Sequence, residues 1–223
     1  MEIAEISGDI LSRAVAYVCH GISCFYKGFF TAAEEHLLKG VDLCERIQSH
    51  SVSAMGHQAL GYAYFEKGDY KKSQIHYDKA ILFRKRTGIF PSCLNLNRMA
   101  LARAVLAAGE TDLDIESLKQ LLRTHKSKLY YGIMARHLAE ILSHLGSAHF
   151  AEAETWLETA ILSHQQLVMK WDLASDYVVF AELLKLQGRA EEEKDYLTKA
   201  LLLFSECGAE GWRRKIGTGC AEG

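Results

Sequence analysis

The amino-acid sequence predicts an all-α protein of about five antiparallel helix pairs, and three observations support this prediction. Ala, Leu, Glu and Lys, which are good helix formers, dominate long stretches of the 223-residue chain. The chain has 17 glycines but one proline, and it lacks the Val-, Ile- and Thr-rich runs of a sandwich or barrel. Glycines also recur at intervals of roughly 40 residues between apolar segments, which indicates an internal repeat.

The recurring glycines mark the expected turns within each helix pair. Each one follows an apolar helical segment and precedes another. A helix C-terminus favours a residue that tolerates the left-handed conformation, and glycine does so without strain. We therefore expect a helix to end at each of Gly28, Gly68, Gly109, Gly146 and Gly188.

The expected helices follow from these turns. Their approximate ranges are 9–27 with 30–48, 51–67 with 70–87, 91–108 with 112–124, 128–145 with 149–168, and 171–187 with 190–206. Pro91 comes just after Gly88, as expected where one helix ends and the next begins. Thr111 and Ser127 are the expected N-caps of the helices that follow them.

No linker or low-complexity stretch separates the repeats, so the sequence predicts one solenoid domain over residues 1–223. The expected repeats are about 9–48, 51–87, 91–124, 128–168 and 171–206. The remaining residues, 207–223, are expected to form a short C-terminal tail. Its Gly-rich end after Trp212 is expected to fray.

The residues around the turns also repeat. Gly21 and Phe25 recur one repeat later as Gly61 and Phe65, and small residues recur on the helix after each turn. This pattern of small, aromatic and glycine positions resembles the tetratricopeptide repeat (TPR) over about residues 9–206. The resemblance implies a right-handed superhelical solenoid. Its long period is similar to that of the TPR-like repeats of bacterial signal-transduction ATPases.

The last repeat, 171–212, shows a narrower resemblance. Its phrase LFSECGAEGW is similar to the closing repeat of large bacterial proteins that combine a cyclase or kinase domain, a STAND-type ATPase and a TPR tail. The resemblance implies that this chain is the C-terminal segment of such a signalling protein. None of the catalytic motifs of those proteins stands in this sequence.

Charge and composition exclude several function classes. The chain has 26 basic and 28 acidic residues, which gives a net charge of -2 and no field suited to a nucleic acid. No apolar run reaches the length of a membrane span, and no secretory signal opens the chain. The six cysteines are scattered without CxxC pairs, which is typical of reduced thiols. We expect a cytoplasmic protein.

The sequence predicts neither an enzyme nor a cofactor or metal site. It lacks G-x-S-x-G, H-E-x-x-H and P-loop motifs. His36 and His76 occupy equivalent places in consecutive repeats, where helices lie about 10 Å apart, so they converge only with favourable rotamers. The adjacent Cys19 and His20 diverge by about 100° on a helix. We expect the ten histidines to be partly exposed surface residues.

The TPR resemblance implies a ligand groove lined by the first helix of each pair. The register with Gly21 and Gly61 places an apolar set in the N-terminal half and a polar set of mixed charge in the C-terminal half. The expected groove residues are Val18, Ile22, Phe25, Met55, Gln58, Tyr62, Phe65, Met99, Arg103, Arg136 and Glu140.

This groove predicts a module that binds a protein or peptide, with Phe25, Tyr62 and Phe65 as anchors and Arg103 and Arg136 steering the ligand. A competing interpretation is that preceding repeats once covered the apolar face. A clamp for chaperone C-termini is disfavoured, because apolar Val18 and Ile22 occupy the positions where it needs polar residues.

Two further functions remain open. One is a sensor of a peptide pheromone or small ligand, for which Asn95, Asn97 and Arg98 form the candidate cluster. The other is a homo-oligomer, in which the apolar first helices pair with a second chain.

Overall fold

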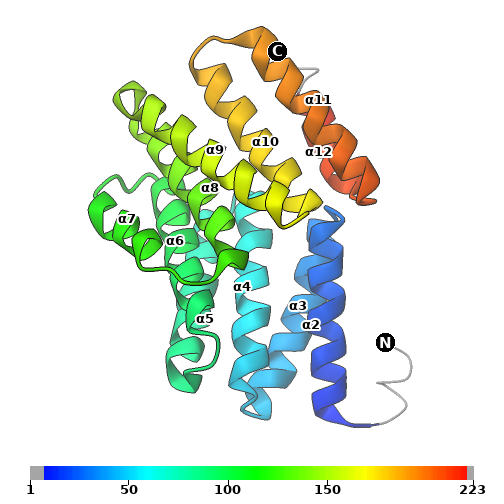
Figure 1. The fold of residues 1–223 in the computed structure, drawn as a ribbon. Coiled ribbons are helices and arrows are strands. Elements are labelled where there is room, and N and C mark those ends of the chain that lie inside the picture. Colours follow the sequence, from blue (N-terminus) through cyan, green and yellow to red (C-terminus); the bar gives the residue numbers. More distant parts are fainter. Residues whose placement is uncertain (1–7, 220–223) are drawn as a thin grey trace. The chain divides into compact units, whose positions relative to one another are not determined.

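The computed structural model describes residues 8–219, and within that range it contains eleven α-helices, one short 3-10 helix and no strand (Figure 1). The prediction of an all-α fold is therefore confirmed. None of the described helices combines the length and apolar character of a membrane span.

The chain divides into two compact units, Met1–Ala108 and Gly109–Gly223, with the boundary just after the fifth helix of the described chain. The expected third helix pair spans this boundary, since its first helix falls in one unit and its second in the other. The single continuous domain over 1–223 stays a prediction.

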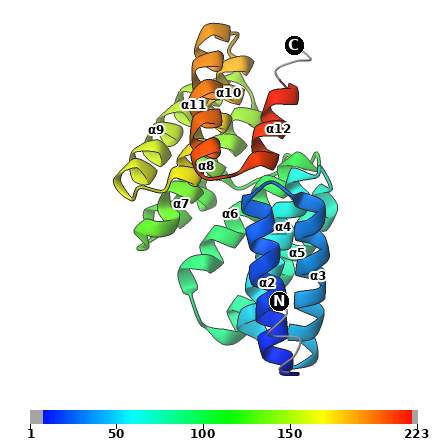
Figure 2. The same cartoon turned by 90° about the vertical axis from the view of Figure 1, so that its right-hand side faces the viewer.

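The first unit contains two antiparallel helix pairs and a fifth helix. Helix α2 packs against α3, α4 packs against α5, and α3 and α4 join the two pairs (Figure 2). Helix α6 covers α5. Their bounds are Ile10–Tyr26 (α2), Phe30–Arg46 (α3), His50–Glu66 (α4), Tyr70–Thr87 (α5) and Pro91–Ala107 (α6).

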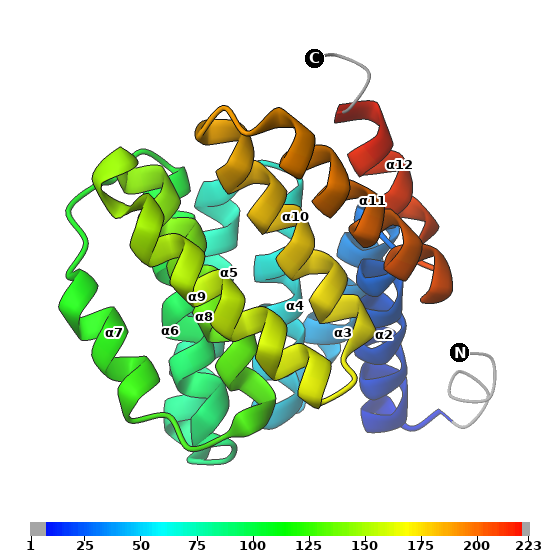
Figure 3. The same ribbon diagram turned by 45° about the horizontal axis from the view of Figure 1, so that its top comes forward.

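The second unit repeats this arrangement after a short helix. Helix α8 packs against α9, α10 against α11, and α9 against α10 (Figure 3). The bounds are Ile115–Arg123 (α7), Lys128–Leu145 (α8), Phe150–Gln166 (α9), Lys170–Leu186 (α10), Ala190–Glu206 (α11) and Glu210–Gly219 (α12), with the 3-10 helix η1 at Ser147–His149.

The turn glycines behave as the repeat predicts. Gly28, Gly68, Gly109, Gly146 and Gly188 all have positive φ, between 74° and 120°. At the second turn the Gly68 amide donates to the Phe65 carbonyl at 2.9 Å, and the next amide donates to the Tyr64 carbonyl at 3.0 Å. These bonds satisfy carbonyls that the helix end leaves without partners. Pro91 opens α6 after the left-handed Gly88, as predicted.

Three expectations at helix ends were wrong or only partly correct. Asp114, not Thr111, caps α7, because its carboxylate accepts from the Ser117 amide at 3.0 Å and the helix begins at Ile115. Ser127 does precede α8, but its side chain makes no capping bond. The segment after Trp212, which was expected to fray, is helical as far as Gly219, and its last residues, 220–223, lie outside the described part of the chain.

That segment forms α12 because an aromatic side chain holds it in place. Trp212 is buried against Trp171 and Phe204, with ring centroids 5.4 and 5.7 Å away. Helix α12 therefore extends the aromatic packing between α10 and α11. Burial of one large ring offsets the poor helix propensity of the glycines that follow.

Paired helices approach closest at glycines. A Cβ built on Gly61 of α4 would lie between 2.6 and 2.8 Å from three carbons of the Tyr77 ring on α5. Gly21 stands in the same relation to Leu37 one repeat earlier. Tyr77 and Leu37 are fully buried, so each occupies the space that the missing side chain leaves.

We expect Gly61→Ala to lower the free energy of unfolding by about 1–3 kcal/mol, because the added methyl overpacks a rigid buried ring. This loss should exceed the gain of about 1 kcal/mol that alanine brings to a helix interior. Urea unfolding followed by circular dichroism measures the change. Gly217→Ala in α12 is the matched control, since no heavy atom lies within 4 Å of its Cβ. Equal stability of both variants would contradict the close packing.

Candidate functional site

The expected groove residues differ widely in exposure. Val18 and Met99 are fully buried, so a ligand could reach neither without displacing helix packing. Phe25 and Arg103 are each 7% exposed. The partly exposed members, all in the first unit, are Ile22, Met55, Gln58, Tyr62 and Phe65.

Four of these residues form a continuous row across α2, α4 and α6, which we call the aromatic row: Phe25, Tyr62, Phe65 and Arg103. The Phe25 and Tyr62 ring centroids lie 5.9 Å apart. The guanidinium carbon of Arg103 lies 3.6 Å from the centroid of Phe65. Helices α2 and α4 are the first members of their pairs, as the sequence predicts, and α6 packs against α5.

A buried cluster packs against the inner side of the aromatic row. Tyr77, Ala100 and Ala104 are fully buried, and Tyr62 and Phe65 pack against them. The Tyr62 and Tyr77 rings meet edge to face, with centroids 5.5 Å apart and planes at 86°. This geometry is favourable for aromatic pairs, and it holds the outer rings in defined positions.

The row can bind apolar or aromatic side chains. Tyr62 and Phe65 are partly exposed, and rigid rings give large contact area at little cost in side-chain entropy. The guanidinium of Arg103 is almost fully buried and stacks on the Phe65 ring, so it orients that ring and places a positive charge against its face.

Arg136 and Glu140 lie in the second unit, on α8, and both side chains are almost fully buried. One guanidinium nitrogen of Arg136 donates to the Asp176 carboxylate at 2.8 Å and to the Asp172 carbonyl at 2.9 Å. The steering role expected of Arg136 therefore has little support, because its charge is used within the unit.

His164 completes this buried network. Its Nδ1 donates to the second carboxylate oxygen of Asp176 at 2.6 Å, and both side chains have no exposed surface. The residues expected from the sequence to line a site do not include Asp172, Asp176 or His164. A usable signal was the spacing of the two aspartates, four residues apart on one face of an otherwise apolar helix.

An Asp–His pair is also a component of hydrolytic sites, but this one has no room for a substrate. A Cβ on Gly132 of α8 would lie 2.6 Å from His164 Nε2. The nitrogen that would act as a base thus faces a helix backbone. Together with Arg136, the pair joins α8, α9 and α10 and stabilises the second unit.

The first unit has its own buried polar cluster, which centres on His57. Its Nε2 lies 2.8 Å from Glu45 Oε1, and its Nδ1 lies 2.9 Å from Nδ1 of His76. A carboxylate only accepts, so we assign Nε2–H of His57 as the donor to Glu45 and Nδ1–H of His76 as the donor to His57. The expectation of partly exposed surface histidines was wrong for His57, His137 and His164, which are at most 1% exposed.

Aromatic rings enclose these two imidazoles. Phe83 stacks on His57 and Tyr64 stacks on His76, with centroids 5.7 and 5.2 Å apart. Burial, aided by the adjacent His57 and by Lys79, lowers the pKa of His76 to about 4. Both rings are thus neutral at physiological pH, and they act as packed polar side chains.

Comparisons with known proteins agree with this fold. A model of the tetratricopeptide repeat matches residues 56–86, which include Tyr62 and Phe65 of the aromatic row and the supporting Tyr77. No curated protein sequence matches the chain.

Two solved structures of the nearly identical TPR-like repeats of a predicted kinesin light chain from Podosopora anserina are similar to the chain. The first, a single-substitution variant, has a TM-score of 0.54, 16% identity, and coverage of 89% of this chain and 98% of that chain. The second has a TM-score of 0.52 and 16% identity, and the shared region covers 88% and 97% of the two chains. At this identity the likeness shows a TPR-like fold and nothing further.

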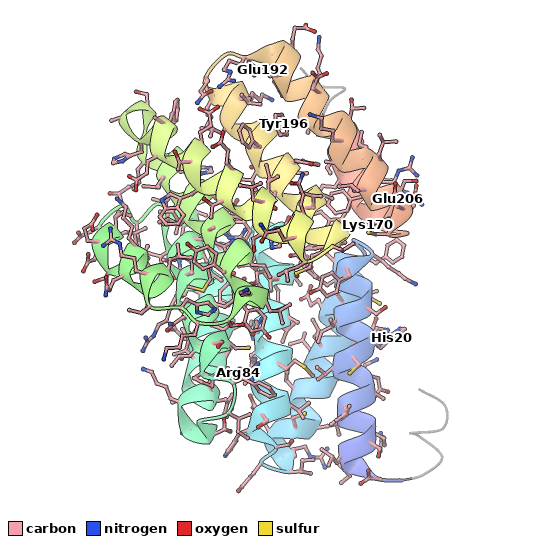
Figure 4. The ribbon with its side chains drawn as sticks, viewed as in Figure 1. His20, Arg84, Lys170, Glu192, Tyr196 and Glu206 are labelled. Carbon is pink, nitrogen blue, oxygen red and sulfur yellow. The ribbon has the colours of Figure 1, made fainter. Side chains whose placement is uncertain are left out.

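We expect Asp176→Asn to lower the free energy of unfolding by about 3 kcal/mol or more, because it leaves the buried Arg136 charge poorly compensated. Chemical denaturation monitored by tryptophan fluorescence measures the loss. The control is Glu206→Gln, which breaks the exposed Lys170–Glu206 pair (2.8 Å; Figure 4) and should not shift the midpoint measurably. Similar midpoints for the two variants would show that the buried network contributes no more to stability than a surface ion pair.

The low pKa of His76 predicts a pH-dependent stability. Between pH 6.5 and about 4 the unfolded chain binds a proton that the folded chain excludes, so stability falls as pH falls through this window. For this partly exposed ring we expect a loss of about 1–2 kcal/mol.

Urea unfolding at pH 7.5 and pH 5 measures this loss, and His76→Gln should reduce it. Most carboxylates stay ionised at both pH values, so their contribution is small. The pKa values of His57 and His36 are also lowered. Both residues are retained in both proteins, so the comparison isolates the effect of His76. An unchanged pH slope in His76→Gln would be evidence against a neutral buried His76.

Proposed function

We propose that this chain binds a peptide or a segment of another protein on the aromatic row of the first unit. TPR-like repeats are generally protein–protein interaction scaffolds, and the fold of this chain is TPR-like. The ligand surface comprises Phe25, Tyr62, Phe65 and Arg103, with Ile22, Met55 and Gln58 at its margins.

The observation that carries this proposal is the contact between aromatic side chains from successive first helices. Phe25 of α2 touches Tyr62 of α4, and Arg103 of α6 covers Phe65 of α4. Such preformed aromatic anchors are typical of protein-binding hot spots. The favoured ligand is a segment with apolar or aromatic side chains.

We further propose that the chain is a regulatory part of a larger bacterial signalling protein and works in the cytoplasm without catalytic activity of its own. The resemblance of residues 171–212 to the closing repeats of cyclase or kinase proteins with a STAND-type ATPase supports this context. Repeat modules contact mainly their neighbours, so a bound ligand can change how adjacent pairs pack and relay that change along the chain.

The peptide-pheromone alternative has less support. Asn97, the centre of its candidate cluster, is fully buried on α6, and Arg98 is exposed. These two side chains therefore do not present one surface to a peptide backbone. Self-association remains the second candidate, because a second copy could occupy the aromatic row.

We expect Tyr62→Ala with Phe65→Ala to weaken ligand binding by more than tenfold, since the loss of hot-spot side chains costs about 2 kcal/mol or more. The ligand is first captured from a bacterial lysate on the immobilised chain and identified by mass spectrometry. Its affinity for both proteins is then measured by titration calorimetry.

The matched control is Ile75→Ala, an apolar surface position on α5 that is 56% exposed. Circular dichroism must show that all variants stay folded. Equal affinity of the double variant and the control would overturn the proposed surface. Light scattering over a dilution series distinguishes self-association from the binding of another protein. A dimer that forms in the unmodified chain and is lost in Tyr62→Ala/Phe65→Ala would show that a second copy occupies the aromatic row.

A further inference from the structure

Three side chains with metal-ligand chemistry converge on the first helix pair. His20 and Cys24 stand one turn apart on α2, and His36 faces them from α3. One ligand atom from each lies within 4.8 Å of the other two. The His20 and His36 rings meet edge to face, with centroids 4.3 Å apart. His20 itself is exposed, midway along α2 (Figure 4).

We propose that His20, Cys24 and His36 bind a zinc ion, with a fourth coordination position open to water. One thiolate and two imidazoles form a ligand set that zinc accepts, and three protein ligands leave one position free. Zinc bonds of about 2.0–2.3 Å at tetrahedral angles place ligand atoms about 3.3–3.6 Å apart. The three ligand atoms lie within 4.8 Å of one another, so binding requires only a small contraction of the cluster.

His36 is prepared for this role. Its Nδ1 is buried and has no hydrogen-bond partner among the residues that the structure describes. An unpaired buried nitrogen is costly, and a bound cation would satisfy its lone pair.

Cys24 contributes a buried sulfur at a fixed place. It is 9% exposed. Binding of zinc displaces one proton: the S–H bond breaks, the sulfur–zinc bond forms and the proton passes to water. The ion would join α2 to α3 directly beside Phe25, and so fix one end of the aromatic row.

The other histidine cluster is a weaker candidate. Both ring nitrogens of His57 already make hydrogen bonds, to Glu45 and His76. The repeat-equivalent His36 and His76 and the adjacent Cys19 and His20 do not predict a metal site. The signal in the sequence is the one-turn spacing of His20 and Cys24, which places both on one face of a helix.

The test uses the full chain without a histidine tag, under reducing conditions. Titration with Co²⁺ should give a thiolate charge-transfer band that saturates at one ion per chain, and Zn²⁺ should displace the Co²⁺. Cys24→Ser should abolish the band and weaken zinc binding by at least about 100-fold, since even outer-shell changes cost about 10- to 100-fold. His20→Asn, at an exposed position that does not threaten folding, should weaken binding comparably.

The matched control is Cys19→Ser, which removes the neighbouring exposed thiol and should leave zinc affinity unchanged. Thermal unfolding of the metal-free proteins checks that each variant is folded. The proposal is overturned if the unmodified chain gives no charge-transfer band, or if Cys24→Ser and His20→Asn bind zinc as tightly as the unmodified chain. The result does not depend on whether the aromatic row binds a ligand.

Discussion

The close approach of α4 and α5 at Gly61 is the constraint on which the first unit depends. No methyl group fits there, and the fully buried Tyr77 ring fills the space. Tyr62 and Phe65 pack on the cluster that contains this ring. The positions of the partly exposed aromatic side chains therefore follow from a contact in the core. Gly21 and Leu37 show the same relation in the preceding repeat.

Buried polar networks join helices in both units, but they use different residues. In the second unit Arg136 is compensated by Asp176, which also accepts from His164. In the first unit the neutral imidazoles of His57 and His76 stack against aromatic rings, and His57 donates a hydrogen bond to Glu45. The two surfaces proposed to bind ligands, the aromatic row and the cluster of His20, Cys24 and His36, do not include the residues of these networks.

Local sequence signals predicted the helices well, because glycine conformation and helix propensity act over a few residues. They could not identify Gln48 and Val168 as left-handed turn residues, since neither residue type favours that conformation. They also missed α12, which depends on Trp212 reaching Trp171. The exposure of Arg136, Val18 and Met99 could not be predicted either, because it depends on tertiary packing around a given helix face.

The central claim is that a partner contacts the first helices of the first unit. The most direct measurement is photo-crosslinking of the full chain with p-benzoylphenylalanine at position 62 of α4, compared with position 75 of α5. A discrete adduct formed from position 62 and absent from position 75 is the predicted result. Adducts formed mainly from position 75, or equally from both positions, would contradict the account.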